Sequence, residues 1–157
     1  IEFARNVLGK ADAQTTEINE ESKDAVIDLM SEQKKISHKG GTMRLGAYNC
    51  ELRPDTKVYE AYKTEKISER HRHRFEFNNA YLEEFEQNGM IATGINPETE
   101  LVEVIELKEH PWFVGVQFHP EFKSTVANPH PLFVAFIRAS LKSKKDTVEQ
   151  KNKETIE

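Results

Sequence analysis

Apolar residues occur along this chain in short runs separated by polar segments, a pattern typical of a fold that combines strands with helices. Short apolar runs and period-two alternation predict strands at 25–30, 42–52, 69–77, 90–94, 101–107 and 112–116. Apolar positions at helical spacing predict helices at 1–8, 56–62, 79–88 and 129–141. We expect the apolar stripe of the last helix to be buried. After it the sequence is nearly all polar and charged, which predicts a folded part over 1–143 and a disordered tail over 144–157.

The run at 112–116 is apolar on both faces, which predicts a strand in the middle of a covered sheet. It is followed by His119-Pro120-Glu121, and chemistry in open α/β sheets lies just past the carboxyl ends of such strands. Pro120 favours an extended His119, so that His119 and Glu121 share a face. A carboxylate beside an imidazole keeps one ring nitrogen protonated and leaves the other free as a base. The pair is therefore half of a candidate catalytic triad; the alternative is a surface His and Glu at a strand end.

A second unusual stretch, 69–77, alternates basic and aromatic residues. Period-two geometry places Arg70, Arg72 and Arg74 on one face of a strand, with the histidines and phenylalanines on the other. Three arginines on one face suit an anion such as a carboxylate or a phosphate, and the alternative is salt bridges to nearby glutamates. The arrangement does not favour nucleic acid, which needs aromatics on the same face as the cations. The histidines predict no metal site, because no Cys or further His has zinc-ligand spacing.

Composition indicates a globular protein of one domain, with 37% hydrophobic and 31% charged residues in 157. The formal net charge of −5 argues against nucleic acid or an acidic membrane as the partner of the whole molecule. No apolar run is long enough to span a bilayer. The single cysteine, Cys50, lies inside a predicted strand and is expected to be a small buried side chain rather than a nucleophile. It cannot form an intramolecular disulfide, so we expect a soluble, cytoplasmic protein.

The chain begins at Ile1 inside the first predicted helix, with neither an initiator Met nor an N-cap residue. We therefore expect that it was cut from a longer protein. The polar segment 10–21 predicts a loop, and its Glu17 is by default a solvated carboxylate.

Four segments carry a family resemblance: Val114–Phe122, which includes the His-Pro-Glu motif, and the stretches 40–46, 69–76 and 129–133. The first resembles the end of class I glutamine amidotransferase domains, and many amidotransferases share it. All four in this order are more specific, and they resemble the CTP synthase family. The opening residues 1–5 are similar to the helix that follows the nucleophile in that family, so that the resemblance covers residues 1 to about 143.

The resemblance implies an α/β, flavodoxin-like fold with a mostly parallel sheet and flanking helices, of which this chain is the C-terminal portion. It implies a Cys-His-Glu triad in which His119 and Glu121 are the last two members. The family's cysteine belongs before residue 1, and Cys50 does not match it.

Two glutamine-binding residues of the family carry over to this sequence. Arg74 suits the α-carboxylate of glutamine by charge, and Glu17 suits its α-ammonium group. Arg44 and His73 lie in family-typical segments, and the resemblance assigns them no role.

For an intact parent, the resemblance implies hydrolysis of glutamine and transfer of the ammonia to a synthetase domain of the same chain. There ATP and Mg would support amination of UTP to CTP, while GTP stimulates the glutaminase. The parent is expected to be a homotetramer. The 157-residue chain would carry no cofactor and, without the cysteine, no activity.

Three alternatives stay open. The chain could derive from another class I amidotransferase or a γ-glutamyl hydrolase, although the Arg-His-Arg-His-Arg run counts against both. It could be a non-catalytic module that binds an anion or nucleotide through that run. It could also be a stable breakdown product without a function of its own.

Overall fold

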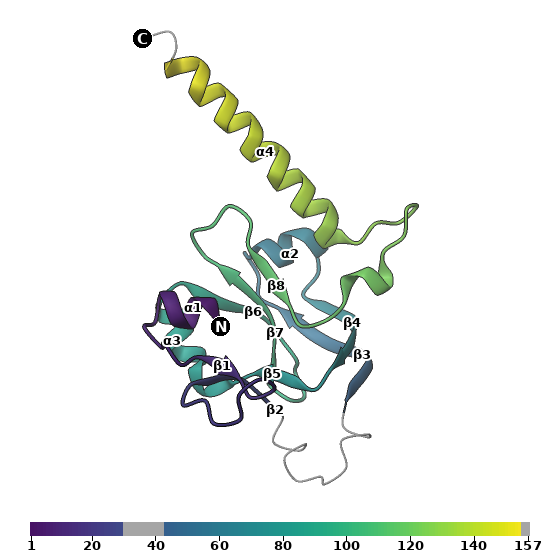
Figure 1. The fold of residues 1–157 in the computed structure, drawn as a ribbon. Helices are drawn as coiled ribbons and strands as arrows, with labels where there is room; N and C mark the ends of the chain where they lie inside the picture. Colours follow the sequence, from purple (N-terminus) through teal and green to yellow (C-terminus); the bar gives the residue numbers. More distant parts are fainter. Residues whose placement is uncertain (30–42, 155–157) are drawn as a thin grey trace.

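A computed structural model describes residues 1–29 and 43–154, and these residues form two sheets with flanking helices (Figure 1). One sheet has the order β1-β2-β5, with bounds Gln14–Thr15, Ala25–Leu29 and Phe75–Phe77. The other has the order β4-β3-β6-β7-β8, with bounds Lys66–His73, Arg44–Leu52, Met90–Ile95, Val102–Leu107 and Val114–Val116. The α-helices are α1 (Glu2–Asn6), α2 (Lys57–Tyr62), α3 (Leu82–Gln87) and α4 (Pro131–Glu154). Two 3₁₀ turns are η3 (Asn79–Tyr81) and η4 (Pro120–Lys123).

Strand direction differs from the expected mostly parallel sheet. Among the described pairs only β1 and β2 are parallel, and the remaining pairs are antiparallel. The physical reason is the length of the connections. Residues 96–101 between β6 and β7 form a short turn, which joins antiparallel neighbours, whereas a parallel pair needs a long crossover.

The strand β8 is also placed differently from the prediction. It lies at the end of the strand order rather than in its middle, and its three residues are half-buried. Its apolar character has another cause, because Val114 and Val116 pack with Trp112 against a hydrophobic cluster. His119 follows the carboxyl end of this strand, but the rule for parallel α/β sheets does not apply to an antiparallel end strand, so the site prediction rests on the His119–Glu121 pair itself.

Two hydrophobic clusters hold the elements together, and β7 contributes to both. Val104 packs with Cys50, Val58 and Phe118 under α2 and the start of α4. On the opposite face, Ile105 packs against the cluster that α1, β2 and α3 form. Because neighbouring side chains of β7 point to opposite faces of the sheet, this strand contributes to both clusters.

The long helix α4 corrects two predictions. Leu132 is buried, but most of the expected buried stripe is exposed: Phe133, Phe136, Ile137 and Leu141. The helix also continues to Glu154, through residues for which a disordered tail was predicted. These residues are mostly Lys, Glu, Gln and other helix-compatible types, so they extend the helix without needing a packed face. Figure 1 shows α4 leaving the body of the molecule after its first turns. The domain division at residue 143 stays a prediction.

Within the described ranges, no helix has both the length and the apolar composition needed to cross a bilayer.

Candidate active site

His119 and Glu121 lie in direct contact just after β8. His119 Nδ1 is 2.7 Å from Glu121 Oε1, and 38% of the His119 side chain and 56% of the Glu121 side chain are exposed. The hydrogen bond from His119 lowers the pKa of the Glu121 carboxyl below its ordinary value. Because Nδ1 faces the carboxylate, Nδ1 carries the ring proton. Nε2 is then unprotonated and is the nitrogen that can act as a base. The predicted contact is present, and its catalytic role stays a prediction.

Arg74 lies in the bend between β4 and β5, which breaks the alternation expected for the arginine run. Arg70 and Arg72 are exposed on β4, whereas Arg74 is half-buried. Its Nε atom is buried and has no hydrogen-bond partner within residues 1–29 and 43–154. The three arginines therefore do not form one surface, and Arg74 differs from the other two.

Glu17 and Arg74 lie at the same end of the three-stranded sheet, next to its two outer strands β1 and β5. Glu17 follows β1, where Thr16 N donates to the Ile27 carbonyl at 3.0 Å and continues the parallel pairing with β2. Leu29 at the end of β2 pairs with Phe75, the residue after Arg74. Two strand spacings separate β1 from β5, which is about 10 Å. Glu17 is exposed and Arg74 is half-buried.

The side chain of Gln117 connects this end of the three-stranded sheet to the segment that carries His119 and Glu121. Gln117, two residues before His119, donates from Nε2 to the Phe75 carbonyl at 3.4 Å. Further on, His119 N donates to the Arg70 carbonyl at 2.8 Å. The segment after β8 thus crosses to β4 and β5, and it brings His119 and Glu121 to the side of the molecule that carries Arg74.

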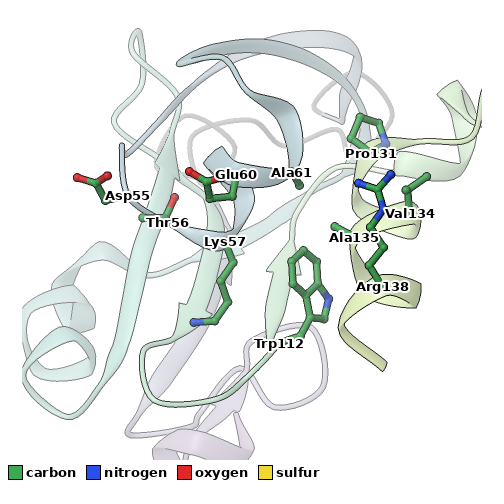
Figure 2. Close-up of a pocket in the computed structure, with 10 residues that line it drawn as sticks. All are labelled: Asp55, Thr56, Lys57, Glu60, Ala61, Trp112, Pro131, Val134, Ala135 and Arg138. Atoms are coloured by element: carbon green, nitrogen blue, oxygen red, sulfur yellow. The ribbon is translucent and has the colours of Figure 1, made fainter. Parts of the chain in front are cut away.

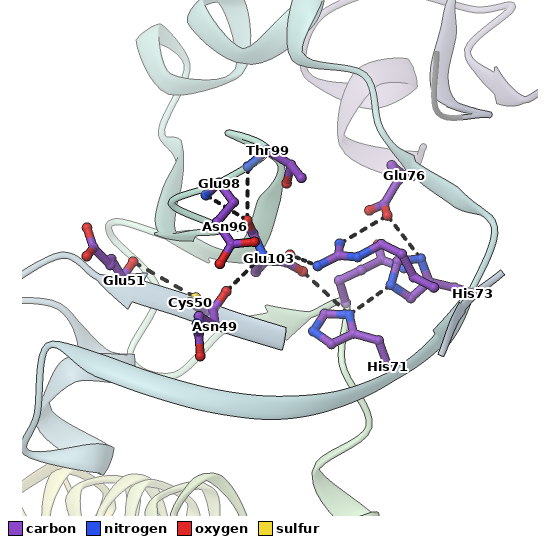
Figure 3. A network of polar contacts seen from close by, with 12 residues as sticks. Asn49, Cys50, Glu51, His71, His73, Glu76, Asn96, Glu98, Thr99 and Glu103 are labelled. Carbon is purple, nitrogen blue, oxygen red and sulfur yellow. Dashed lines mark hydrogen bonds and ion pairs between the residues drawn. The ribbon is translucent and has the colours of Figure 1, made fainter. Parts of the chain in front are cut away.

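Behind this region lies a buried polar network, shown in Figure 3. Arg44 Nη1 donates to Glu76 Oε1 at 3.1 Å, and Nη2 donates to Glu103 Oε1 at 2.7 Å. His71 Nδ1 is 2.8 Å from His73 Nε2 and 3.6 Å from Glu103 Oε2. Burial raises the pKa of Glu76 to about 7, and it lowers the pKa of His71 to about 3 and of His73 to about 4, with Arg44 adding to the effect on both histidines.

Sequence reasoning left Arg44 and His73 without roles and missed Glu76 and Glu103. The available signal was the placement of acidic residues inside apolar strands, where an unpaired charge is costly. An acidic residue at such a position indicates that a cationic side chain lies nearby, but it does not identify that side chain.

Cys50 is buried in β3, as predicted, with 1% of its surface exposed. Burial raises the pKa of its thiol to about 12. Such a thiol is protonated at neutral pH and is a poor nucleophile.

One hollow among the described residues lies away from the residues above (Figure 2). It has a volume of about 530 Å³ between α2, α4 and Trp112, and its lining includes Lys57, Glu60 and Arg138. None of the sequence-predicted site residues lines it. Over the described part of the chain, no three His, Cys, Asp or Glu side chains are grouped so that they could hold a metal ion.

Comparison with known proteins decides the family. The model of the family "Glutamine amidotransferase class-I" matches residues 1–139. This chain belongs to that family. A CTP synthase from Christiangramia forsetii is 60% identical over 152 residues, covering 97% of this chain and 27% of that protein. One from Bacteroides fragilis is 62% identical over 141 residues, covering 90% of this chain and 26% of that protein. The chain thus spans about a quarter of the length of these CTP synthases.

A solved structure agrees with the sequence matches. The glutaminase domain of Trypanosoma brucei CTPS with bound acivicin superposes with a TM-score of 0.83 and 34% identity, over 90% of this chain and 55% of that one. A GMP synthase protein from Thermoplasma acidophilum, described as putative, has a TM-score of 0.51 at 17% identity over 67% of this chain and 48% of that one, and it supports the fold alone. The predicted amidotransferase fold is therefore confirmed, with mixed rather than mostly parallel strand pairing.

Proposed function

We propose that this amidotransferase chain supplies the His–Glu half of a glutaminase site in a CTP synthase. The observation that carries the proposal is the 2.7 Å contact between His119 Nδ1 and Glu121 Oε1, which leaves Nε2 available. The match of nearly the whole chain to CTP synthases supports it.

In the proposed reaction, a cysteine thiolate attacks the side-chain amide carbon of glutamine. His119 delivers a proton to the leaving nitrogen, the C–N bond breaks, and ammonia leaves a γ-glutamyl thioester. His119 then removes a proton from water, which attacks the thioester and releases glutamate and the thiolate. Glu121 keeps the imidazole oriented and stabilises its protonated form, as the acid of a triad does.

We assign the nucleophile to a residue outside these 157, and we therefore propose that the chain alone is inactive. The support is Cys50, the only cysteine of the sequence, which is buried and has a pKa raised to about 12. A nucleophilic cysteine needs an accessible thiolate, usually beside a histidine or another cation.

Substrate binding is assigned to Glu17 and Arg74, at one end of the three-stranded sheet. Arg74 would bind the α-carboxylate of glutamine through charge-assisted hydrogen bonds, and Glu17 would bind the α-ammonium group. Their position at one end of the three-stranded sheet, with β1 and β5 about 10 Å apart by strand spacing, supports the assignment because the substrate's two α-groups would lie between them.

The remaining parts of the reaction are proposed for the parent enzyme. Ammonia would pass to a synthetase domain of the same chain, where ATP and Mg support amination of UTP to CTP and GTP stimulates the glutaminase. A homotetrameric assembly and a cytoplasmic location stay predictions.

The test is glutamate release from glutamine, measured on the parent enzyme and on this chain alone. In the parent, His119→Ala should reduce kcat by about 10²-fold or more, since it removes the acid–base group. Arg74→Ala should raise KM about 10-fold to 100-fold, because a hydrogen bond to a charged group contributes roughly 1.5–3 kcal/mol. Arg72→Ala is the matched control, since Arg72 is exposed two residues away, and it should leave KM nearly unchanged.

Two outcomes would contradict the proposal. Glutamate release by the chain alone would overturn the assignment of the cysteine and direct attention to Cys50, which Cys50→Ser would then test. A larger effect from Arg72→Ala than from Arg74→Ala would favour the alternative of an anion-binding module, for which the exposed Arg70 and Arg72 are the specific observation.

A further inference from the structure

Glu121 lies on η4, a turn of only four residues, and its side chain is 56% exposed. Hydrogen bonds inside so short a turn cannot fix its orientation on the protein, because a single 3₁₀ turn closes very few of them. The contact between His119 and Glu121 therefore depends on how the rest of the protein holds η4.

The N-terminal end of η4 is fixed by β4. His119 N donates to the Arg70 carbonyl at 2.8 Å. The ring of Phe122 stacks on the ring of His119, with centroids 5.0 Å apart and an angle of 22° between planes. These contacts restrain the histidine, but they leave the far end of the turn free.

The far end is fixed by the residues around Glu69. Lys123, the last residue of η4, donates from Nζ to the Ser68 carbonyl, and its Nζ is 3.7 Å from Glu69 Oε2. The next residue, Ser124, accepts a hydrogen bond at Oγ from His130 N at 3.1 Å. His130 Nε2 in turn lies 3.2 Å from Glu69 Oε1. Both connections from the end of η4 lead to one carboxylate.

Glu69 is suited to this position because it is buried, its Oε1 has two hydrogen-bond partners, and its Oε2 forms an ion pair with Lys123. Only 3% of its surface is exposed, and Oε1 also accepts a hydrogen bond from Tyr62 OH at 3.0 Å. Burial acts to raise the pKa of Glu69, but the hydrogen bonds with His130 and Tyr62 outweigh it and lower the pKa. A buried carboxylate is thus kept ionised directly beneath the candidate catalytic turn.

We propose that Glu69 is a positioning residue: through Lys123 and His130 it holds η4 so that Glu121 remains on Nδ1 of His119. Stability alone does not explain a buried ionised carboxylate, since well-packed apolar residues often stabilise a protein as well or better. The inference deepens the proposed function and rests on it for its biological meaning. The structural claim has its own test.

The test reads the tautomer of His119 in this chain by long-range proton–nitrogen NMR at pH 8, above the ordinary histidine pKa of about 6.5. In the native chain the Nδ1-protonated tautomer should be the major form, because Glu121 accepts from Nδ1. In Glu69→Gln the share of this tautomer should fall, since Lys123 and His130 lose their charged partner. In the parent enzyme the same variant should lower kcat and leave KM nearly unchanged.

Two further variants make the result decisive. Lys123→Met, at a side chain that is 43% exposed, should shift the tautomer in the same direction and to a smaller extent, and it decides the matter if Glu69→Gln does not fold. Glu51→Gln is the matched control, because it removes a Glu–Lys pair, with Lys66, on the exposed surface of β3 and should change nothing. An unchanged tautomer in folded Glu69→Gln and Lys123→Met would overturn the proposal. The NMR measurement needs no glutamine, so its failure is distinguishable from failure of the glutaminase assignment.

Discussion

His71 illustrates how one buried side chain acquires properties that its sequence neighbours lack. Its surface is 1% exposed, and it lies near Glu103, His73, Tyr48 and Phe118. Burial and the positive charge of Arg44 lower its pKa to about 3. A histidine with a lowered folded pKa stabilises the protein fully above its ordinary pKa, and the contribution is lost as pH falls toward the folded value.

We therefore predict that removing His71 makes the protein less sensitive to acid. Between pH 7 and pH 5 the native free energy of unfolding should fall by about 2 kcal/mol more than that of His71→Asn, given 1.36 kcal/mol for each pH unit below 6.5. Urea unfolding at the two pH values measures the difference. The comparison with the variant is essential because Glu76, whose pKa is raised to about 7, changes stability in the opposite sense. Parallel curves for the two proteins would contradict the burial of an uncharged His71.

Among the elements, α2 shows that a short helix can depend on a distant strand. Thr56 caps it in the usual way, accepting from Tyr59 N at 3.3 Å. In addition, Glu106 of β7 accepts hydrogen bonds from Lys57 N at 3.0 Å and from Val58 N at 2.8 Å. These are free backbone donors at the helix start, so β7 fixes the position of α2 above the core.

We predict that Glu106→Ala lowers the free energy of unfolding by about 2–3 kcal/mol, because it leaves one buried and one partly buried backbone donor without a partner. Chemical denaturation monitored by circular dichroism measures the loss. The matched control is Glu60→Ala, an exposed glutamate on α2 itself, which should change stability by less than about 0.5 kcal/mol. Equal effects from the two substitutions would show that the contact with β7 is not what stabilises the helix.

For the molecule as a whole, the body and the extended part of α4 contribute unequally to stability. The first turn of α4 packs through Leu132, which is 7% exposed and belongs to a core cluster. Residues 141–147 are all exposed, and the helix extends away from the two sheets (Figure 1). The free energy of folding should therefore come almost entirely from the residues before this extension.

We predict that deleting residues 144–157 reduces the helical circular dichroism signal and changes the free energy of unfolding by less than about 0.5 kcal/mol. The same deletion tests the predicted domain limit at residue 143. Leu132→Ala is the contrasting variant and should cost about 2–4 kcal/mol, since it removes a buried side chain. A large loss of stability on deletion would mean that the distal helix belongs to the folded unit.

Much of the secondary structure was predictable, because its signals are local. The turn at 96–99, for example, is set by Asn96, whose side chain accepts from Glu98 N and Thr99 N. Errors arose where packing decides. The apolar stripe of α4 has helical spacing whether or not another element covers it, and β8 is apolar although it lies at the end of the strand order.

The sequence determined the family, the order of most elements, and the pairing of His119 with Glu121, because each follows from residues close together in the chain. Only the tertiary structure placed Glu17 and Arg74 at one end of the three-stranded sheet and Arg74 in a bend after β4. It also matched Arg44 with Glu76 and Glu103, which lie 32 and 59 positions away. A buried charge requires a partner, but which partner it finds depends on strand pairing and burial, and neither is encoded within a few neighbouring residues.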